Sequence, residues 1–473
     1  MESIRKYMLE RKILSKLVEW TGREHKCLVL KGQRQVGKTY ILDHFGKTYY
    51  SDYILLNLYE DPIARRIFEE NSTVDEIVDS ISLHTNRTIE PRNTLIVLDE
   101  IQESTRARAM LKAFSNDKRY DVIASGSLLG VSDARLGKFK KTANPDLLPV
   151  GGEEHLTMYP LDFEEFLWAV GMKKSDIDRI RNSIRDRDPL KEVDMEIMDR
   201  RYRTYSIVGG MPKAVEMFVE SGMAAAQREL KGILDTCIND INRYNSGVDV
   251  IKTQQCFGSI PRQLSSTNKR FQYSRIEDGG SRNASVKFRD NLLWIRYAGY
   301  GGFVSSLTAI RSPLHRFVEP EVYKVYMSDS GLLMEMMGPD SRTAMMMGDT
   351  SYDFGAVTEN VVASNLMKLG YPLYYYRNSN GDNRMELDLI LENGGLVAIE
   401  VKTGAKREHP SLKKTLNDRN IYRRIIFEKG NIAVDENGIE HYPLFASAFL
   451  FDEFDDSIDG SLTEGIVGDP YAR

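Results

Sequence analysis

The sequence has only three cysteines, Cys27, Cys237 and Cys256. They lie too far apart for a local CxxC metal site, and an odd number cannot form a fully paired set of disulfides. The sequence also lacks an apolar run near the roughly 20 residues that a membrane-spanning helix needs. Residues 1–7 lack the apolar core of a secretion signal. These absences argue against a membrane protein and a secreted protein, so we expect a cytoplasmic chain.

A large excess of charge of one sign is also absent. The net charge is −5, but residues 451–473 hold seven acidic side chains against Arg473 alone. This acidic tail therefore contributes −6 and leaves the rest of the chain near neutral, at about +1. A near-neutral body with local basic clusters is compatible with nucleic-acid contact but does not require it.

The length predicts several domains. The chain has 473 residues, of which 41% are hydrophobic and 28% are charged. This composition is typical of soluble globular proteins, and a prior of roughly 150 residues per domain gives about three domains.

Residues 32–39 fit the phosphate-binding loop pattern G-x-x-x-x-G-K-[ST]. The apolar residues 27–30 predict a buried strand before the loop, and residues 40–45 predict a helix after it. The backbone N–H groups of such a loop turn toward phosphate oxygens, Lys38 can reach the outer phosphates, and the Thr39 hydroxyl is the expected Mg²⁺ ligand. The predicted nucleotide-binding residues are Gly32, Gln33, Arg34, Gln35, Val36, Gly37, Lys38 and Thr39.

A second nucleotide motif follows at residues 94–100, where an apolar strand ends in Asp99 and Glu100. In phosphate-loop NTPases an aspartate at this place holds Mg²⁺, and an adjacent glutamate can polarise the attacking water. We therefore predict Asp99 as a metal ligand together with Thr39, and Glu100 as a catalytic residue. A solvated acidic turn is the simpler reading of an isolated Asp-Glu pair, but the upstream phosphate loop favours the functional one.

A further strand at residues 121–124 ends in Ser125-Gly126-Ser127. A hydroxyl at this strand end can hydrogen-bond the γ-phosphate or the attacking water, so Ser125 is a third catalytic candidate, although Ser-Gly-Ser is also a common turn. Alternating strands and helices predict a mostly parallel sheet with helices on both faces. The strand between the two nucleotide motifs, together with Glu100, resembles the AAA-type ATPases.

We place the ATPase core at residues 1–155 and a helical lid over the nucleotide at residues 156–245. In the lid region Asp162 is the expected N-cap of a helix at residues 163–170, and Pro212 fits the first position of another helix.

Residues 246–345 show helical patterns at 251–256, 261–264 and 285–297, followed by 299–303. This order resembles a winged helix, a module that reads DNA or dimerises. Three amphipathic helices are more often plain packing, so DNA contact by this region stays one of two readings.

Charged residues near the C-terminus alternate in a way that suggests a second site. Residues 385–391 place Glu386 and Asp388 on one face, and residues 397–402 do the same for Glu400 and Lys402. A three-residue loop centred on Gly394 sets Asp388 opposite Glu400 and Glu386 opposite Lys402. A two-residue turn would put Asp388 and Glu400 on opposite faces.

Clustered carboxylates can hold a divalent metal, and a nearby ammonium group can stabilise a phosphodiester transition state. Asp388 and Glu400-Val401-Lys402, with Glu359 on a predicted helix at residues 358–369, resemble the PD-(D/E)xK restriction-endonuclease-like fold. We predict Asp388 and Glu400 as metal ligands and Lys402 as catalytic, while an ordinary exposed hairpin is the alternative. The basic residues downstream favour a polyanion surface: Lys406, Arg407, Lys413, Lys414, Arg419, Arg423 and Arg424.

The order of motifs resembles that of one family, the prokaryotic AAA-type ATPases that carry a C-terminal domain of unknown function with a nuclease-like fold. Besides the motifs above it includes Pro160-Leu161-Asp162-Phe163, Gly209-Gly210-Met211-Pro212 and residues 327–333. The resemblance covers roughly residues 5–450 and implies ATP and Mg²⁺ as cofactors. It implies an α/β multidomain chain with a phosphate-loop parallel sheet, a helical lid, a winged helix at 246–345, and a restriction-endonuclease-like domain at 346–450 before the tail at 451–473.

Two functions follow from the resemblance. In the first, ATP hydrolysis controls a metal-dependent nuclease or DNA-binding end domain. In the second, the chain is a nucleotide-dependent switch or scaffold whose nuclease-like domain has lost catalysis. DNA and further copies of this chain are the candidate partners besides ATP. No arginine finger can be assigned among Arg106, Arg108 and Arg135.

Overall fold

The computed structural model describes residues 9–127, 152–277, 283–349, 351–379, 384–403 and 410–454. The chain divides into two compact units. The N-terminal unit comprises residues 10–159 and 297–299, and the C-terminal unit comprises residues 160–296 and 300–473 with residues 1–9.

The N-terminal unit is built on a parallel sheet of five strands in the order β2-β3-β4-β1-β5. Every residue of β3 is buried, as expected for a strand covered on both faces. Strand β4, which contains the strand predicted at residues 121–124, lies between β1 and β3. The strands are β1 (Cys27–Gly32), β2 (Asp52–Asn57), β3 (Thr94–Asp99), β4 (Asp121–Ser127) and β5 (Glu153–Thr157).

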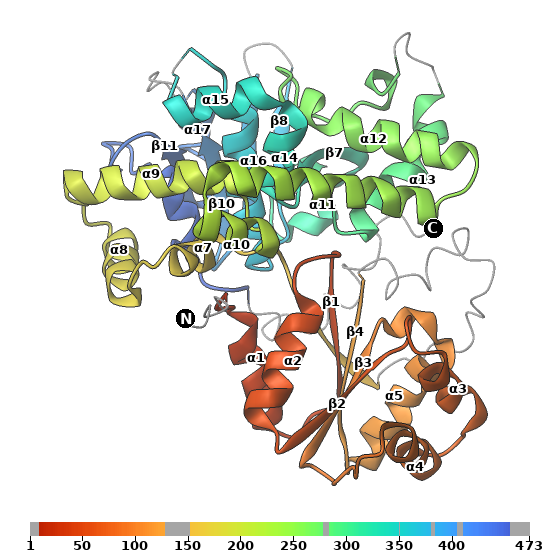
Figure 1. Cartoon of the computed structure of the whole chain (residues 1–473). Coiled ribbons are helices and arrows are strands. Elements are labelled where there is room, and N and C mark those ends of the chain that lie inside the picture. The colour runs from red at the N-terminus through yellow and green to blue at the C-terminus, as the bar shows by residue number, and fades with distance from the viewer. Residues whose placement is uncertain are drawn as a thin grey trace. The chain divides into compact units, whose positions relative to one another are not determined.

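Helices cover both faces of this sheet, as Figure 1 shows, with α1 and α2 on one side and α3, α4 and α5 on the other. Two separate hydrophobic clusters mark the two faces. The helices are α1 (Ile13–Thr21), α2 (Lys38–Tyr49), α3 (Pro62–Glu70), α4 (Val74–Thr85) and α5 (Thr105–Asp117). The predicted layered α/β architecture is confirmed for this unit.

The C-terminal unit contains a mixed sheet of eight strands in the order β12-β13-β11-β10-β9-β8-β6-β7. Strands β6 and β7 form an antiparallel pair, and β6 continues the sheet by parallel pairing with β8. The strands are β6 (Gly301–Leu307), β7 (Val318–Met327), β8 (Tyr374–Asn378), β9 (Met385–Glu392), β10 (Leu396–Val401), β11 (Ile421–Glu428), β12 (Ala433–Val434) and β13 (Glu440–Pro443). The predicted domain boundary between residues 345 and 346 therefore separates β6 and β7 from the other strands of the same sheet.

The region predicted as a lid forms helices of the C-terminal unit. Asp162 accepts a hydrogen bond from the Glu165 backbone in a capping box, and Pro212 is the first residue of α10, as the sequence predicts. The helices of this region are α7 (Phe163–Ala169), α8 (Lys174–Asp186), α9 (Glu192–Val208), α10 (Pro212–Ser221) and α11 (Met223–Tyr244).

The winged helix is not confirmed. The first two predicted helical patterns join into one helix, α12 (Val248–Leu264), and the third is α13 (Ala284–Tyr297). Pro261 lies inside α12, three residues before its end, and removes one backbone N–H from the helical hydrogen bonds. The hairpin of β6 and β7 that follows is part of the large sheet and not a separate wing.

Asp329 connects two motifs that lie far apart in the sequence. Its carboxylate caps α14 (Ser330–Met337) by accepting the Leu332 N–H, and it also accepts the Gly210 N–H at 2.6 Å. A side chain at Gly210 would overlap the backbone of Leu161. The motifs at residues 209–212 and 327–333 therefore pack against each other within the C-terminal unit. The remaining helices are α15 (Pro339–Met347), α16 (Gly355–Lys368) and α17 (Pro410–Lys414).

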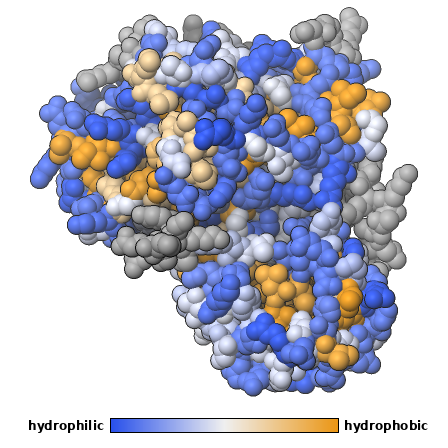
Figure 2. All heavy atoms as spheres, viewed as in Figure 1, coloured by the Kyte–Doolittle hydropathy of each residue, from blue (hydrophilic) through white to orange (hydrophobic). Residues whose placement is uncertain are grey.

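On the face drawn in Figure 2, hydrophobic side chains form small separate patches among hydrophilic ones. Within the described part of the chain, no helix combines the length and the apolar character needed to cross a membrane.

Candidate functional site

The phosphate loop connects the end of β1 to the start of α2. Gly37 has φ of 92° and Gln35 has φ of 64°, both in the left-handed region that turns successive N–H groups toward one side. At Gly32 a side chain would overlap the backbone carbonyl of Met158. Glycine is therefore favoured at Gly37 by the backbone conformation and at Gly32 by the close approach of Met158.

Lys38 is buried within this loop. Its Nζ donates hydrogen bonds to the carbonyl oxygens of Gly32 and Gln33, both at 3.0 Å. Burial lowers the pKa of Lys38 to about 8, and the charges of Glu100 and Asp99 oppose this shift only in part. The ammonium group is therefore held against the loop that would receive the phosphates.

Three predicted residues converge at the carboxyl ends of the strands. The Thr39 hydroxyl donates to Asp99 Oδ2 at 2.8 Å, and the Ser125 hydroxyl donates to Asp99 Oδ1. Ser125 reaches Asp99 because β4 lies directly beside β3. A hydroxyl and a carboxylate next to a buried ammonium group are the oxygen ligands that Mg²⁺ takes in a phosphate-loop site, so Thr39 and Asp99 fit that ion.

Glu100 follows Asp99 in an unusual backbone conformation. Its φ is 56°, in the left-handed region that a glutamate adopts at a cost in energy. The Gln102 side-chain amide donates to Glu100 Oε2. The Glu100 carboxylate is therefore oriented by Gln102.

Arg11 was not among the predicted site residues. Its guanidinium donates to the carbonyl of Val36 within the phosphate loop at 3.0 Å and to the carbonyl of Tyr159 at 2.6 Å. A single arginine before a helix carries no local signal for this role. Of the three arginines considered as a finger, Arg108 pairs with Glu153 at 3.0 Å and Arg135 lies outside the described residues.

The C-terminal hairpin has the three-residue loop. The register pairs Leu396 with Glu392 and Ile399 with Leu389, which sets Asp388 opposite Glu400. The Val401 backbone N–H donates to Asp388 Oδ2 at 2.9 Å. The conditional prediction that Asp388 and Glu400 share a face is confirmed by this register.

Glu359, on the buried face of α16, joins this group of carboxylates. It accepts hydrogen bonds from Lys324 at 3.0 Å and from Lys269 and Tyr326. Although burial opposes its ionisation, the ammonium groups of Lys269 and Lys324 hold the pKa of Glu359 well below its ordinary value. Lys324, from β7, was not predicted as a site residue.

Glu400 pairs with Lys402, two positions along the chain. Its second oxygen, Oε2, is buried and has no hydrogen-bond partner. Burial raises the pKa of Glu400, and Lys402 offsets this only in part. Over the ranges that the structure describes, no set of three or more His, Cys, Asp and Glu side chains is arranged to hold a metal ion.

Two of the downstream basic residues, Arg423 and Arg424, are engaged within the protein. Arg423 makes two hydrogen bonds to Glu440, at 2.9 and 2.8 Å, and Arg424 donates to the carbonyls of Ile421, Thr415 and Asp418. Lys406 and Arg407 lie outside the described residues. Arg423 and Arg424 thus have structural partners and weaken the prediction of a polyanion surface.

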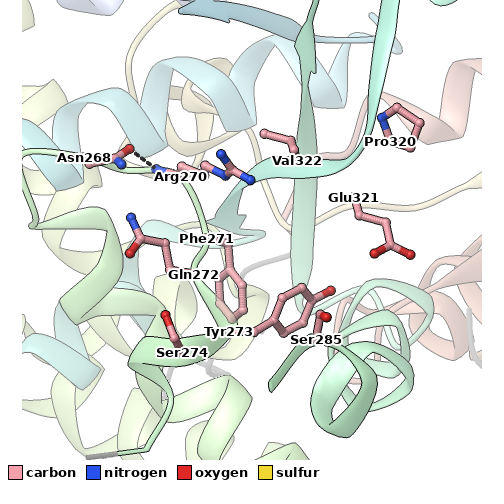
Figure 3. Close-up of a pocket in the computed structure, with 10 residues that line it drawn as sticks. All are labelled: Asn268, Arg270, Phe271, Gln272, Tyr273, Ser274, Ser285, Pro320, Glu321 and Val322. Carbon is pink, nitrogen blue, oxygen red and sulfur yellow. Dashed lines mark hydrogen bonds between the residues drawn. The ribbon is translucent and has the colours of Figure 1, made fainter. Parts of the chain in front are cut away.

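A cavity of about 530 Å³ lies in the C-terminal unit beside β7. Figure 3 shows Asn268, Arg270 and Tyr273 on one side of it and Pro320, Glu321 and Val322 on the other. The Arg270 N–H donates to Asn268 Oδ1 at 3.2 Å. None of the residues predicted from the sequence as site residues lines this cavity.

Comparison with family models divides the chain into three matches. Residues 24–167 match an AAA domain, residues 199–343 match a domain of unknown function (DUF8612), and residues 354–445 match another domain of unknown function (DUF4143). A search of curated proteins gives no match. The nuclease-like character of the last domain is thus not confirmed.

Three solved structures that match this chain share little sequence with it. A Walker-type ATPase of Pyrococcus abyssi is 13% identical, with 70% of this chain and 97% of that chain covered and a TM-score of 0.43. A STAND signal-transduction ATPase of Pyrococcus horikoshii is 11% identical, with 77% and 45% covered and a TM-score of 0.26. AMPPCP-bound DnaA of Aquifex aeolicus is 14% identical, with 55% and 73% covered and a TM-score of 0.26.

The family match spans the phosphate loop, Asp99 and Ser125, which are the residues that the geometry brings together. Residues 24–167 therefore match an AAA domain, and this match supports an ATP-binding ATPase.

Proposed function

We propose that the chain is a Mg²⁺-dependent ATPase whose nucleotide state controls its C-terminal unit. The observation that carries the proposal is the convergence of Thr39 and Ser125 on the two oxygens of Asp99, beside the buried ammonium group of Lys38. Mg²⁺ bound by Thr39 and Asp99 would neutralise charge on the phosphates. Glu100, next to Asp99, supplies the carboxylate that hydrolysis needs in addition to nucleotide binding.

Each residue of the site has a separate task in this proposal. Lys38 exchanges its two carbonyl partners for phosphate oxygens when the nucleotide binds. Glu100 accepts a proton from the attacking water, and Gln102 orients its carboxylate. Ser125 fixes the orientation of Asp99. Arg11 holds the phosphate loop in place through the Val36 carbonyl.

The binding step is tested by Lys38→Ala. We expect ATP affinity to fall at least ~100-fold, since the only ammonium group placed in the loop is removed. Isothermal titration calorimetry with a non-hydrolysable ATP analogue measures this change. Lys47→Ala removes an exposed lysine of the same helix and serves as the matched control. Undiminished affinity in Lys38→Ala would refute the ATPase proposal.

We propose that the C-terminal unit controlled by the nucleotide binds a partner without cleaving it, and we favour this over a nuclease. Asp388 and Glu400 face each other as the nuclease-like reading requires. However, Lys324 lies among the carboxylates, 3.7 Å from Asp388 and 3.0 Å from Glu359. The position of Lys324 among the carboxylates is the observation that favours binding without cleavage. DNA is the partner to be tested.

A further inference from the structure

We propose that the ammonium group of Lys324 takes the place of a metal ion in the C-terminal carboxylate cluster, so that this cluster binds no divalent cation. The inference deepens the second part of the proposed function, and it does not depend on ATP hydrolysis. The cluster consists of Glu359 on α16, Glu386 and Asp388 on β9, and Glu400 on β10.

Lys324 occupies a central position among three of these carboxylates. Its Nζ lies 3.0 Å from Glu359, 3.5 Å from Glu386 and 3.7 Å from Asp388. The lysine is 0% exposed. An ammonium group buried at this depth persists only where carboxylates compensate the lost hydration.

The position of Lys324 is fixed by strand pairing on both sides. It stands opposite Val304 of β6 and forms an isolated bridge with Arg270. Its ammonium group also lies 5.1 Å from the centre of the Tyr375 ring, within the range of a cation–π contact. The side chain therefore has little freedom to leave the cluster.

A count of oxygen atoms shows why a metal does not fit. Glu359 Oε1 accepts from Lys324 and Tyr326, and Glu359 Oε2 accepts from Lys269. Asp388 Oδ2 accepts the Val401 N–H, and Asp388 Oδ1 faces Lys324. The Glu386 oxygens lie 3.5 Å from Lys324 and 3.6 Å from Arg377, and Glu400 Oε2 has no hydrogen-bond partner. Mg²⁺ binds through one or two carboxylates besides its waters, so a divalent cation would have to displace Lys324 from Glu359, Glu386 and Asp388.

Charge leads to the same conclusion. Three ammonium groups, from Lys269, Lys324 and Lys402, face the four carboxylates. With the Arg377 guanidinium 3.6 Å from Glu386, four cationic side chains balance the four carboxylates, so the cluster has no excess of negative charge to attract a divalent cation. Replacing Lys324 with an uncharged residue reverses the situation, because it leaves buried carboxylates without a central cation and with space for one.

The test measures Mn²⁺ binding to the full chain without nucleotide, by calorimetry and by electron paramagnetic resonance. An Asp99→Ala background removes any contribution of the phosphate-loop site. We expect Lys324→Ala to gain one Mn²⁺ site that is absent from the background protein, and Lys324→Ala/Asp388→Ala to lose it again. Lys324→Arg, which keeps a cation, is the matched control and should gain no site.

Two results would overturn the proposal. One is an Mn²⁺ site in the background protein that disappears in Asp388→Asn. The other is a folded Lys324→Ala variant, judged by circular dichroism, that gains no site. If Lys324→Ala does not fold, the comparison with Asp388→Asn still decides, because equal Mn²⁺ binding with and without Asp388 supports the proposal. ATP hydrolysis by the wild-type chain is measured separately, so failure of the ATPase proposal can be distinguished from failure of the proposal about Lys324.

Discussion

Lys38 illustrates how burial prepares a residue for its ligand. The two loop carbonyls that it contacts at 3.0 Å are weaker partners for an ammonium group than phosphate oxygens. Its pKa of about 8 follows from this incomplete compensation for burial. A bound triphosphate would stabilise the charged form and raise the pKa again.

ATP affinity should therefore decrease as the pH rises above about 8. The charged form of Lys38 binds phosphate, and this form is lost in the nucleotide-free protein as the pH passes its pKa of about 8. We expect up to a ~10-fold loss of affinity per pH unit above that value. Binding near pH 9 should also take up a proton, which calorimetry in buffers of different ionisation enthalpy detects. Lys38→Arg is the control, because a guanidinium stays charged, and an identical pH dependence in that variant would exclude Lys38 as the cause.

Asp329 is the residue on which two elements of the C-terminal unit depend. Asp329→Ala removes the cap of α14 and leaves the buried Gly210 N–H without its acceptor. The cap is worth about 1 kcal/mol and the unsatisfied N–H about 1–3 kcal/mol, so we expect a loss of about 2–4 kcal/mol in the free energy of unfolding.

Urea denaturation followed by circular dichroism measures this loss. The matched control is Asp340→Ala, which removes an exposed acid from the first turn of α15 and should stay within about 0.5 kcal/mol of wild type. Equal stability of the Asp329 and Asp340 variants would show that Asp329 does not connect the two motifs.

At the scale of elements, the sequence predicts what depends on neighbouring residues. The phosphate loop, the buried strand before Asp99 and the N-cap at Asp162 are local patterns, and the structure contains each of them. The sequence predicts two possible registers for the hairpin of β9 and β10, one for each loop length. The three-residue loop in the structure selects the register in which Asp388 lies opposite Glu400.

Other features of the fold and the site could not be predicted, because they depend on tertiary contacts between segments that are distant in the sequence. Lys324 lies in a region that resembled a winged helix, and its carboxylate partners come from α16 and β9. Likewise, no local pattern shows that α12 continues through Pro261, or that β6 pairs with β8. Such contacts are set by packing between distant segments, which overrides local propensity.

At the scale of the whole molecule, the proposed control requires that a nucleotide bound to residues 32–39 alters the C-terminal unit. Hydrogen–deuterium exchange tests this requirement. We expect ATP with Mg²⁺ to change exchange in peptides of the C-terminal unit of the wild-type chain, since the two states must differ in their free energies of local opening. The same addition to Lys38→Ala should leave exchange unchanged. Changes confined to residues 10–159 of the wild-type chain would contradict control of the C-terminal unit.

The central claim is that the site around Asp99 hydrolyses ATP with Glu100 as the base. The most direct measurement is the rate of phosphate release by Glu100→Gln under saturating ATP and Mg²⁺, together with its ATP affinity. The account predicts affinity within a few-fold of wild type and a turnover lower by about 10²–10⁴, the contribution of a general base. Phosphate release by Glu100→Gln at the wild-type rate would contradict it.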